Sequence, residues 1–85
     1  MSGHAARLVV YSHAWCHLCD EMIAALRELQ NTESFALEIV EIGQQAELEQ
    51  RFGERVPVLV SHGGEELCHY WLDRAKVDEY LSKFR

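Results

Sequence analysis

Apolar side chains change their spacing several times along this 85-residue chain, and each change predicts a new structural element. Residues 7–12 contain the apolar run 8–10, as expected for a strand that is buried on both faces. From Cys16 the apolar residues recur every three or four positions, which predicts a helix that ends within residues 31–34. The apolar face of this helix carries Cys19, Met22, Ile23, Leu26 and Leu29.

The middle of the chain predicts a second strand and a short helix. Residues 35–42 alternate between apolar and other side chains, which is typical of a strand with one buried face. Residues 44–52 have a weaker helical pattern, which ends at Gly53 in the position of a C-terminal cap. The buried face of the strand is expected to carry Phe35, Leu37 and Ile39.

The last third of the chain predicts a β-hairpin and a final helix. Residues 56–60 and 65–69 are predicted strands, joined by a tight turn at residues 62–64, where two glycines can adopt positive φ. Asp73 is the predicted N-cap of the last helix. The face of this helix that is expected to be buried carries Val77, Tyr80, Leu81 and Phe84.

The predicted order of elements is therefore β-α-β-α-β-β-α, which belongs to the α/β class. The first two strands and the helix between them predict a right-handed parallel unit, to which the hairpin adds two strands. A chain of this length is sufficient for one domain and too short for two, so we expect a single domain over residues 1–85.

Composition and charge narrow the classes of function. Hydrophobic residues make up 48% of the chain, but no apolar run approaches the roughly 18 residues of a membrane span. The net charge of −6 argues against a nucleic-acid partner, because phosphate binding requires a basic patch. Residues 1–7 lack the features of a secretory signal, so we expect a cytoplasmic protein that binds no membrane.

Two of the three cysteines form a C-x-x-C motif, Cys16-His17-Leu18-Cys19, where the first strand gives way to the first helix. A thiol at a helix N-terminus lies near unpaired N–H groups and the positive end of the helix dipole, which favour the thiolate. Cys16 is therefore expected to attack a substrate disulfide, with a pKa below the roughly 8.5 of a free thiol. Cys19, one turn into the helix, is expected to resolve the mixed disulfide, and the pair to form an intramolecular disulfide.

Charged neighbours are expected to adjust the acidity of Cys16. A protonated imidazole of His13 or His17 would stabilise the thiolate, whereas Asp20 and Glu21 would destabilise it. Because these effects oppose one another, a moderate shift of the Cys16 pKa is expected.

The third cysteine, Cys68, lies in the predicted fourth strand. It is expected opposite Leu59 or opposite Pro57, depending on which residues form the hairpin turn. Either register places Cys68 toward the end of the sheet that carries the C-x-x-C motif. We expect it to act as a small buried hydrophobic side chain.

A zinc or iron–sulfur site is an alternative for the same residues. His13, Cys16 and Cys19 are suitable zinc ligands, and Cys68 or His69 would complete a set of four. The chain has no second pair of closely spaced ligands, so the redox interpretation is preferred.

The segment from Tyr11 to Cys19 resembles the active-site segment of glutaredoxins and thioredoxins. It is most similar to small bacterial glutaredoxin-like proteins that carry C-H-L-C followed by an acidic residue. Val56-Pro57 resembles the cis-proline element of the same superfamily. This resemblance implies a thioredoxin fold, with a four-stranded mixed sheet flanked by helices. It also implies a cis peptide bond at Pro57, and a Val56 backbone that pairs with an incoming peptide or glutathione.

The sequence departs from the glutaredoxin pattern at positions that bear on the substrate. His17 stands where these proteins usually have proline, and Arg55 stands where they have threonine. Residues 69–73 replace the Gly-Gly and acidic residue that hold glutathione in that family. Arg55 would still meet a substrate carboxylate. Trp15 is a thioredoxin-like feature, which points to a protein disulfide.

We therefore expect a monomeric thiol–disulfide oxidoreductase that acts on protein or glutathione mixed disulfides. No bound organic cofactor and no metal is expected, and electrons would come from glutathione or a reductase. The alternative is a binding module that keeps the fold and uses the surface around Pro57 without turnover. The residues expected to contact substrate are Trp15, His17, Arg55, Val56, Pro57, Tyr70 and Trp71.

Overall fold

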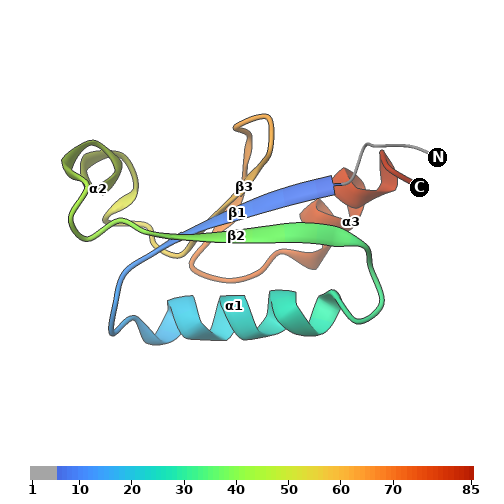
Figure 1. Ribbon diagram of the computed structural model, residues 1–85, viewed down its shortest axis with the longest axis horizontal. Helices are drawn as coiled ribbons and strands as arrows, with labels where there is room; N and C mark the ends of the chain where they lie inside the picture. The colour runs from blue at the N-terminus through green and yellow to red at the C-terminus, as the bar shows by residue number, and fades with distance from the viewer. Residues whose placement is uncertain (1–5) are drawn as a thin grey trace.

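The computed structural model describes residues 6–85 and contains one four-stranded mixed sheet in the order β2-β1-β3-β4 (Figure 1). β1 pairs with β2 in parallel, while β3 is antiparallel to both β1 and β4. The predicted α/β class and the predicted order of elements are confirmed. The strands are β1 (Ala6–Ser12), β2 (Phe35–Glu41), β3 (Val58–Ser61) and β4 (Glu66–His69), and the helices are α1 (His17–Leu29), α2 (Ala46–Phe52) and α3 (Arg74–Ser82).

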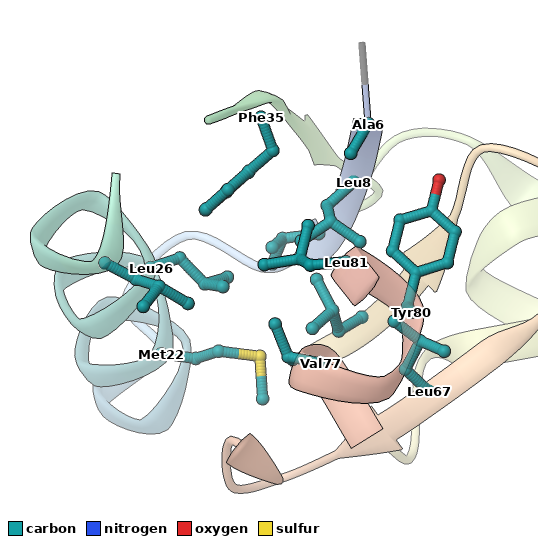
Figure 2. Packing of buried hydrophobic residues seen from close by; sticks show 12 residues of the cluster. Ala6, Leu8, Met22, Leu26, Phe35, Leu67, Val77, Tyr80 and Leu81 are labelled. Atoms are coloured by element: carbon teal, nitrogen blue, oxygen red, sulfur yellow. The ribbon is translucent and has the colours of Figure 1, made fainter. Parts of the chain in front are cut away.

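The main hydrophobic core lies between one face of the sheet and helices α1 and α3. In Figure 2, Met22 of α1 reaches toward Val77 of α3, beneath Leu8 of β1. The hydroxyl of the buried Tyr80 side chain also has a hydrogen-bond partner, because it donates to the Arg7 carbonyl at 3.2 Å. The buried members of this core are Ala6, Leu8, Val10, Met22, Leu26, Leu29, Phe35, Leu59, Leu67, Val77, Tyr80 and Leu81.

A second, smaller core attaches α2 to the opposite face of the sheet. The Phe52 ring of α2 stacks on Tyr11 of β1 with ring centroids 4.4 Å apart. Because β3 is buried on both sides, Val58 and Val60 face this second core while Leu59 faces the main one. Figure 1 shows α2 at the same end of the sheet as the loop from β1 to α1. The second core therefore stabilises the end of the sheet that carries Cys16.

Several element boundaries and one buried position of β2 were predicted wrongly. β3 begins at Val58 rather than at residue 56, since Pro57 has no N–H to contribute to a strand ladder. β2 ends at Glu41, one residue before the predicted end, and α2 begins two residues later than predicted, at Ala46. Ile39 is exposed rather than buried, because β2 is an edge strand with a neighbour on one side only.

The β3–β4 hairpin settles the position of Cys68. Its turn ends at Gly64, whose φ of 96° suits glycine. Leu67 is an extra residue in β4, because the partners of Leu59 and Val60 are Cys68 and Glu66. Of the two predicted registers, the one that places Cys68 opposite Leu59 is correct.

The C-terminal helix begins as predicted and ends earlier. The side chain of Asp73 accepts a hydrogen bond from the Lys76 N–H at 3.2 Å, which confirms it as the N-cap of α3. Phe84 was expected on the buried face, but it lies beyond the last helical residue and is exposed. Its ring instead meets the edge of the Tyr80 ring, with centroids 5.2 Å apart.

None of the three helices in residues 6–85 is long and apolar enough to cross a membrane. The expectation about a secretory signal depends on residues 1–7, of which residues 1–5 lie outside the described part of the chain.

Candidate redox site

Cys16 is the N-cap of α1 and follows the end of β1, at one end of the sheet. Its backbone is extended, with φ −103° and ψ 109°, and its sulfur accepts a hydrogen bond from the Cys19 N–H at 3.1 Å. Its carbonyl accepts the N–H of Asp20 at 3.0 Å, which starts the helix. The sulfur therefore occupies the place where a cap residue satisfies the free N–H groups of a helix, as the sequence predicted.

Cys16 and Cys19 are joined by a disulfide, with their Cα atoms 5.1 Å apart. Cys16 is half-buried, whereas the Cys19 side chain is 1% exposed and lies on the face of α1 that carries Met22. The predicted pairing is thus confirmed, and Cys68 is a free cysteine. Of the two bonded sulfurs, Cys16 is the one that an incoming thiol or disulfide can reach.

The two histidines near the motif are both paired with glutamates. His13 Nε2 lies 2.6 Å from Glu49 Oε1 on α2, and His17 Nε2 lies 3.0 Å from Glu21 Oε2 on α1. Their side chains differ in exposure, since His13 is partly covered and His17 is 87% exposed. His17 is therefore the more accessible of the two imidazoles, whereas His13 links the β1–α1 loop to α2.

The Val56–Pro57 peptide bond is cis, as the resemblance to the thioredoxin superfamily implied. Tyr11, near the end of β1, pairs with Val58 of β3. Pro57 directly precedes Val58, so it lies beside the end of β1, where the loop to Cys16 starts. The segment after β4 is fastened to this proline, because the Tyr70 N–H donates to the Pro57 carbonyl at 2.9 Å. The predicted cis-proline element and the β4–α3 loop thus lie at the same end of the sheet as Cys16, which is called the redox end below.

Arg55 does not point free into solvent at this end of the sheet. Its Nη2 lies 2.9 Å from Glu66 Oε1, and the other oxygen of the same carboxylate lies 3.0 Å from His69 Nδ1. The Arg55 guanidinium also stands 5.8 Å from the centre of the Phe52 ring. The carboxylate that Arg55 was predicted to meet in a substrate is therefore already supplied by Glu66.

Aromatic side chains surround the site. Trp15 is fully exposed, Trp71 is 66% exposed, and their rings were both expected to contact substrate. Trp15 and Tyr70 have positive φ values of 63° and 66°, which are uncommon for residues other than glycine and often mark functional segments. The Tyr70 and Trp71 rings meet edge to face, with centroids 5.5 Å apart.

A shallow groove of about 280 Å³ connects these aromatic residues to the C-x-x-C helix. Leu18, which lies between the two cysteines in the sequence, forms its wall near the motif. The α1 side of this groove was not predicted from the sequence. Its only sequence signal was the apolar residues Leu18 and Ala25, which lie next to the buried face of the helix. The groove is lined by Leu18, Glu21, Met22, Ala25, Tyr70, Trp71 and Leu72.

The surroundings of Cys68 in β4 disfavour ionisation of its thiol. Burial raises the pKa of the Cys68 thiol above its ordinary value, and the carboxylates of Asp73 and Glu66 add to that shift. A hydrogen bond from the Asp73 N–H to the Cys68 sulfur, at 3.4 Å, lowers the pKa and is second in size to the effect of burial. Cys68 is therefore predominantly a neutral thiol at neutral pH.

The residues of the zinc alternative are not gathered into a ligand set. Within residues 6–85, no three His, Cys, Asp or Glu side chains converge in a way that could hold a metal ion. His13 pairs with Glu49 and His69 pairs with Glu66, while Cys16 and Cys19 bond to each other. The geometry accordingly favours disulfide chemistry at the C-x-x-C motif.

The strand order, the crossover helix and the closing ββα unit define a thioredoxin-like fold with its C-x-x-C at the start of the first helix. The same fold is found in the crystal structure of Deadhead, a thioredoxin from Drosophila melanogaster. It has a TM-score of 0.59 and 18% identity, and the match covers 98% of this chain and 84% of that one. At this identity the likeness concerns the fold alone.

The chain belongs to the glutaredoxin-like domain family (DUF836), which matches residues 7–82. Among solved structures, protein Ne2328 from Nitrosomonas europaea is 43% identical with a TM-score of 0.85, and the match covers 95% of this chain and 96% of that one. The target protein XcR50 from X. campestris is 34% identical with a TM-score of 0.71, over 89% of this chain and 96% of that one. No curated protein matches the chain.

Proposed function

We propose that this protein is a thiol–disulfide oxidoreductase that reduces protein or glutathione mixed disulfides through Cys16 and Cys19. The observation that carries the proposal is the disulfide between an accessible helix N-cap cysteine and a buried cysteine one turn later. Cys16 therefore supplies the sulfur that attacks the substrate, and the shielded sulfur of Cys19 lies within bonding distance to resolve the mixed disulfide.

The proposed reaction begins with the reduced protein. The Cys16 thiolate attacks one sulfur of the substrate disulfide, and the substrate's other sulfur leaves as a thiolate and takes up a proton. The Cys19 thiol then loses its proton and attacks the Cys16 sulfur, which forms the Cys16–Cys19 disulfide and releases the second substrate thiol. Two electrons pass from the dithiol to the substrate, and glutathione or a reductase restores them. No bound organic cofactor takes part.

Opposing electrostatic effects would set the reactivity of Cys16. The Cys19 N–H already donates to the Cys16 sulfur, and the same donor would stabilise a thiolate in the reduced protein. Asp20, in the first turn of α1, and the exposed Glu21 oppose the thiolate. We therefore propose a thiol that is activated moderately rather than strongly.

The proposed substrate surface combines the exposed indoles of Trp15 and Trp71 with the groove beside Leu18. Aromatic side chains of this kind bury a large area at low entropic cost when a polypeptide binds. Since Glu66 already neutralises Arg55, the surface offers little to the carboxylates of glutathione. A protein disulfide is therefore the preferred substrate. His17 and the backbone of Val56 and Pro57 complete the proposed surface.

We also propose that the protein acts as a monomer in the cytoplasm, without a nucleic-acid or membrane partner. The net charge of −6 supports the absence of a nucleic-acid partner, because phosphates would be repelled.

Trapping in cells tests the function directly. In a Cys19→Ser variant the mixed disulfide on Cys16 cannot be resolved, so substrate proteins should remain covalently attached and be released by reductant. A Cys16→Ser variant is the matched control and should trap nothing. Equal trapping by the two variants, or trapping through Cys68, would contradict the proposal.

A further inference from the structure

The carboxylate of Glu41 joins two loops at the redox end of the sheet. Its Oε2 atom accepts the N–H of Ala14 at 3.1 Å and the N–H of Gly43 at 3.3 Å. Ala14 stands two residues before Cys16, whereas Gly43 belongs to the segment between β2 and α2. Hydrogen bonds to an ionised acceptor are roughly twice as strong as those between neutral groups.

The strands place Glu41 where it can make this link. In the parallel register Glu41 is opposite Ser12, the last residue of β1. One residue further on, the Ile42 N–H donates to the Ser12 carbonyl at 2.9 Å. The two chains therefore leave the sheet side by side, and the Glu41 side chain extends their connection to Ala14 after the backbone ladder ends.

The loop needs such a restraint because its own packing does not supply one. Trp15 has a positive φ of 63°, a left-handed conformation that is unfavourable for a residue with a side chain. Its indole is fully exposed, so burial of the ring does not offset this cost. The neighbouring residues must hold the backbone, and the described contacts are Ala14 with Glu41 and His13 with Glu49.

We propose that Glu41 is a positioning residue for the redox site. Its carboxylate fixes the Ala14–Trp15 backbone, and thereby holds the Cys16 sulfur in the N-cap position over the Cys19 N–H. Glu41 acts through the loop and does not itself take part in thiol exchange. This inference rests on the proposed function, since it assigns a role to Glu41 in that same site.

The charge of the Glu41 carboxylate and the restraint that it provides are expected to affect the Cys16 thiolate in opposite directions. Suitable variants can therefore separate the two effects. A carboxylate near Cys16 disfavours the thiolate electrostatically, whereas the restraint that it imposes favours the thiolate by keeping the sulfur over a donor. Glu41→Gln removes the charge and keeps an acceptor oxygen for Ala14. Glu41→Ala removes both the charge and the acceptor.

Gly43 offers a third variant that keeps the charge. A Cβ atom at this position would lie 2.8 Å from Glu41 Oε2, closer than real Cβ contacts allow. Gly43→Ala should therefore displace the carboxylate from its two N–H donors while leaving it ionised. This variant also tests the proposal if Glu41→Ala fails to fold.

The experiment measures, in each reduced protein, the pH dependence of Cys16 alkylation by iodoacetamide, with peptide mapping to locate the label. Amide hydrogen exchange at Ala14 reports the restraint itself. The matched control is Glu38→Ala, which removes an exposed carboxylate from the same strand.

The proposal predicts an order of reactivity at neutral pH. Glu41→Gln should react as fast as the wild type or faster, and Glu41→Ala should be at least about threefold slower than Glu41→Gln. This is a modest part of the roughly 100-fold that a 1 Å misplacement can cost. Gly43→Ala should be slower than the wild type, and both slower variants should exchange the Ala14 amide faster. Glu38→Ala should match the wild type.

Two results would overturn the proposal. Equal rates for Glu41→Gln and Glu41→Ala would mean that Glu41 acts through its charge alone. Faster exchange at Ala14 with an unchanged Cys16 profile would mean that the restraint does not position the sulfur. Neither readout needs a substrate disulfide, so a failure of disulfide reduction by the wild type would count against the proposed function and not against this measurement.

Discussion

At the scale of single residues, the three cysteines occupy three different environments. Cys16 is half-buried at the N-terminus of α1, Cys19 is 1% exposed beneath it, and Cys68 sits half-buried in β4. Reactivity of a thiol follows its thiolate fraction and its access to reagent. These two quantities differ enough among the three sites to be measured separately.

Reduced protein treated with a limiting amount of a thiol-alkylating reagent at pH 7 should be labelled first and fastest at Cys16. Cys19 is slower because it is buried, and Cys68 is slower because burial raises its pKa. Peptide mapping over time gives the order. A first label on Cys19 or Cys68 would show that the nucleophile has been misassigned.

The raised pKa of Cys68 also predicts a dependence of stability on pH. The folded state favours the neutral thiol, so the contribution of Cys68 is complete below the pKa of the unfolded chain, roughly 8.5, and is lost as pH rises through the folded value. Urea unfolding between pH 7 and pH 10 should show a steeper alkaline loss of stability for the wild type than for Cys68→Ser. Parallel curves for the two proteins would contradict this account of Cys68.

At the scale of elements, β3, β4 and the end of α2 bring Arg55, Glu66 and His69 together near the cis-proline. The sequence placed Arg55 beside the substrate but could not show its partner, because Glu66 is eleven residues away and meets it only through the hairpin register. Long-range side-chain pairing of this kind is set by the fold rather than by local pattern.

Removal of Glu66 should therefore change substrate preference. Glu66→Ala frees Arg55, which should raise kcat/KM for a glutathione mixed disulfide by at most about fivefold, as expected for an exposed ion pair worth up to about 1 kcal/mol. A neutral peptide disulfide should react as before. Arg55→Ala in the same background should abolish the gain, and Glu65→Ala is the matched control on the hairpin. An equal gain for both substrates would argue against a role for Arg55 in anion recognition.

Local patterns predicted the elements better than their ends. The 3–4 residue spacing from Cys19 to Leu29 identified α1 and its buried face, and Asp73 identified the start of α3. The prediction that Ile39 is buried was wrong, because alternation does not reveal which strand will lie at the edge of the sheet. The role of α1 in the groove was missed for a related reason, since the β4–α3 loop that completes the groove is distant in the sequence.

At the scale of the whole molecule, one end of the sheet collects every group that the proposed reaction needs. The loop from β1 brings Cys16, the segment before β3 brings the cis-proline, and the loop after β4 brings Tyr70 and Trp71. In Figure 1, α1 starts at this end and runs along the sheet, whereas α3 lies toward the opposite end, and both helices contribute to the main core. The strand order of the thioredoxin-like fold thus explains why residues from three distant segments meet.

The most direct test of this account is a single-turnover reaction with purified protein. Fully reduced wild type is mixed with an excess of a peptide disulfide in the absence of any other reductant, and the peptide thiols and the protein disulfides are quantified by mass spectrometry. Each protein molecule should reduce one peptide disulfide to two thiols and end with a Cys16–Cys19 disulfide. Cys68→Ser should behave in the same way, and Cys16→Ser should release no thiol. Reduction of the peptide by Cys16→Ser, or a wild-type product whose disulfide includes Cys68, would contradict it.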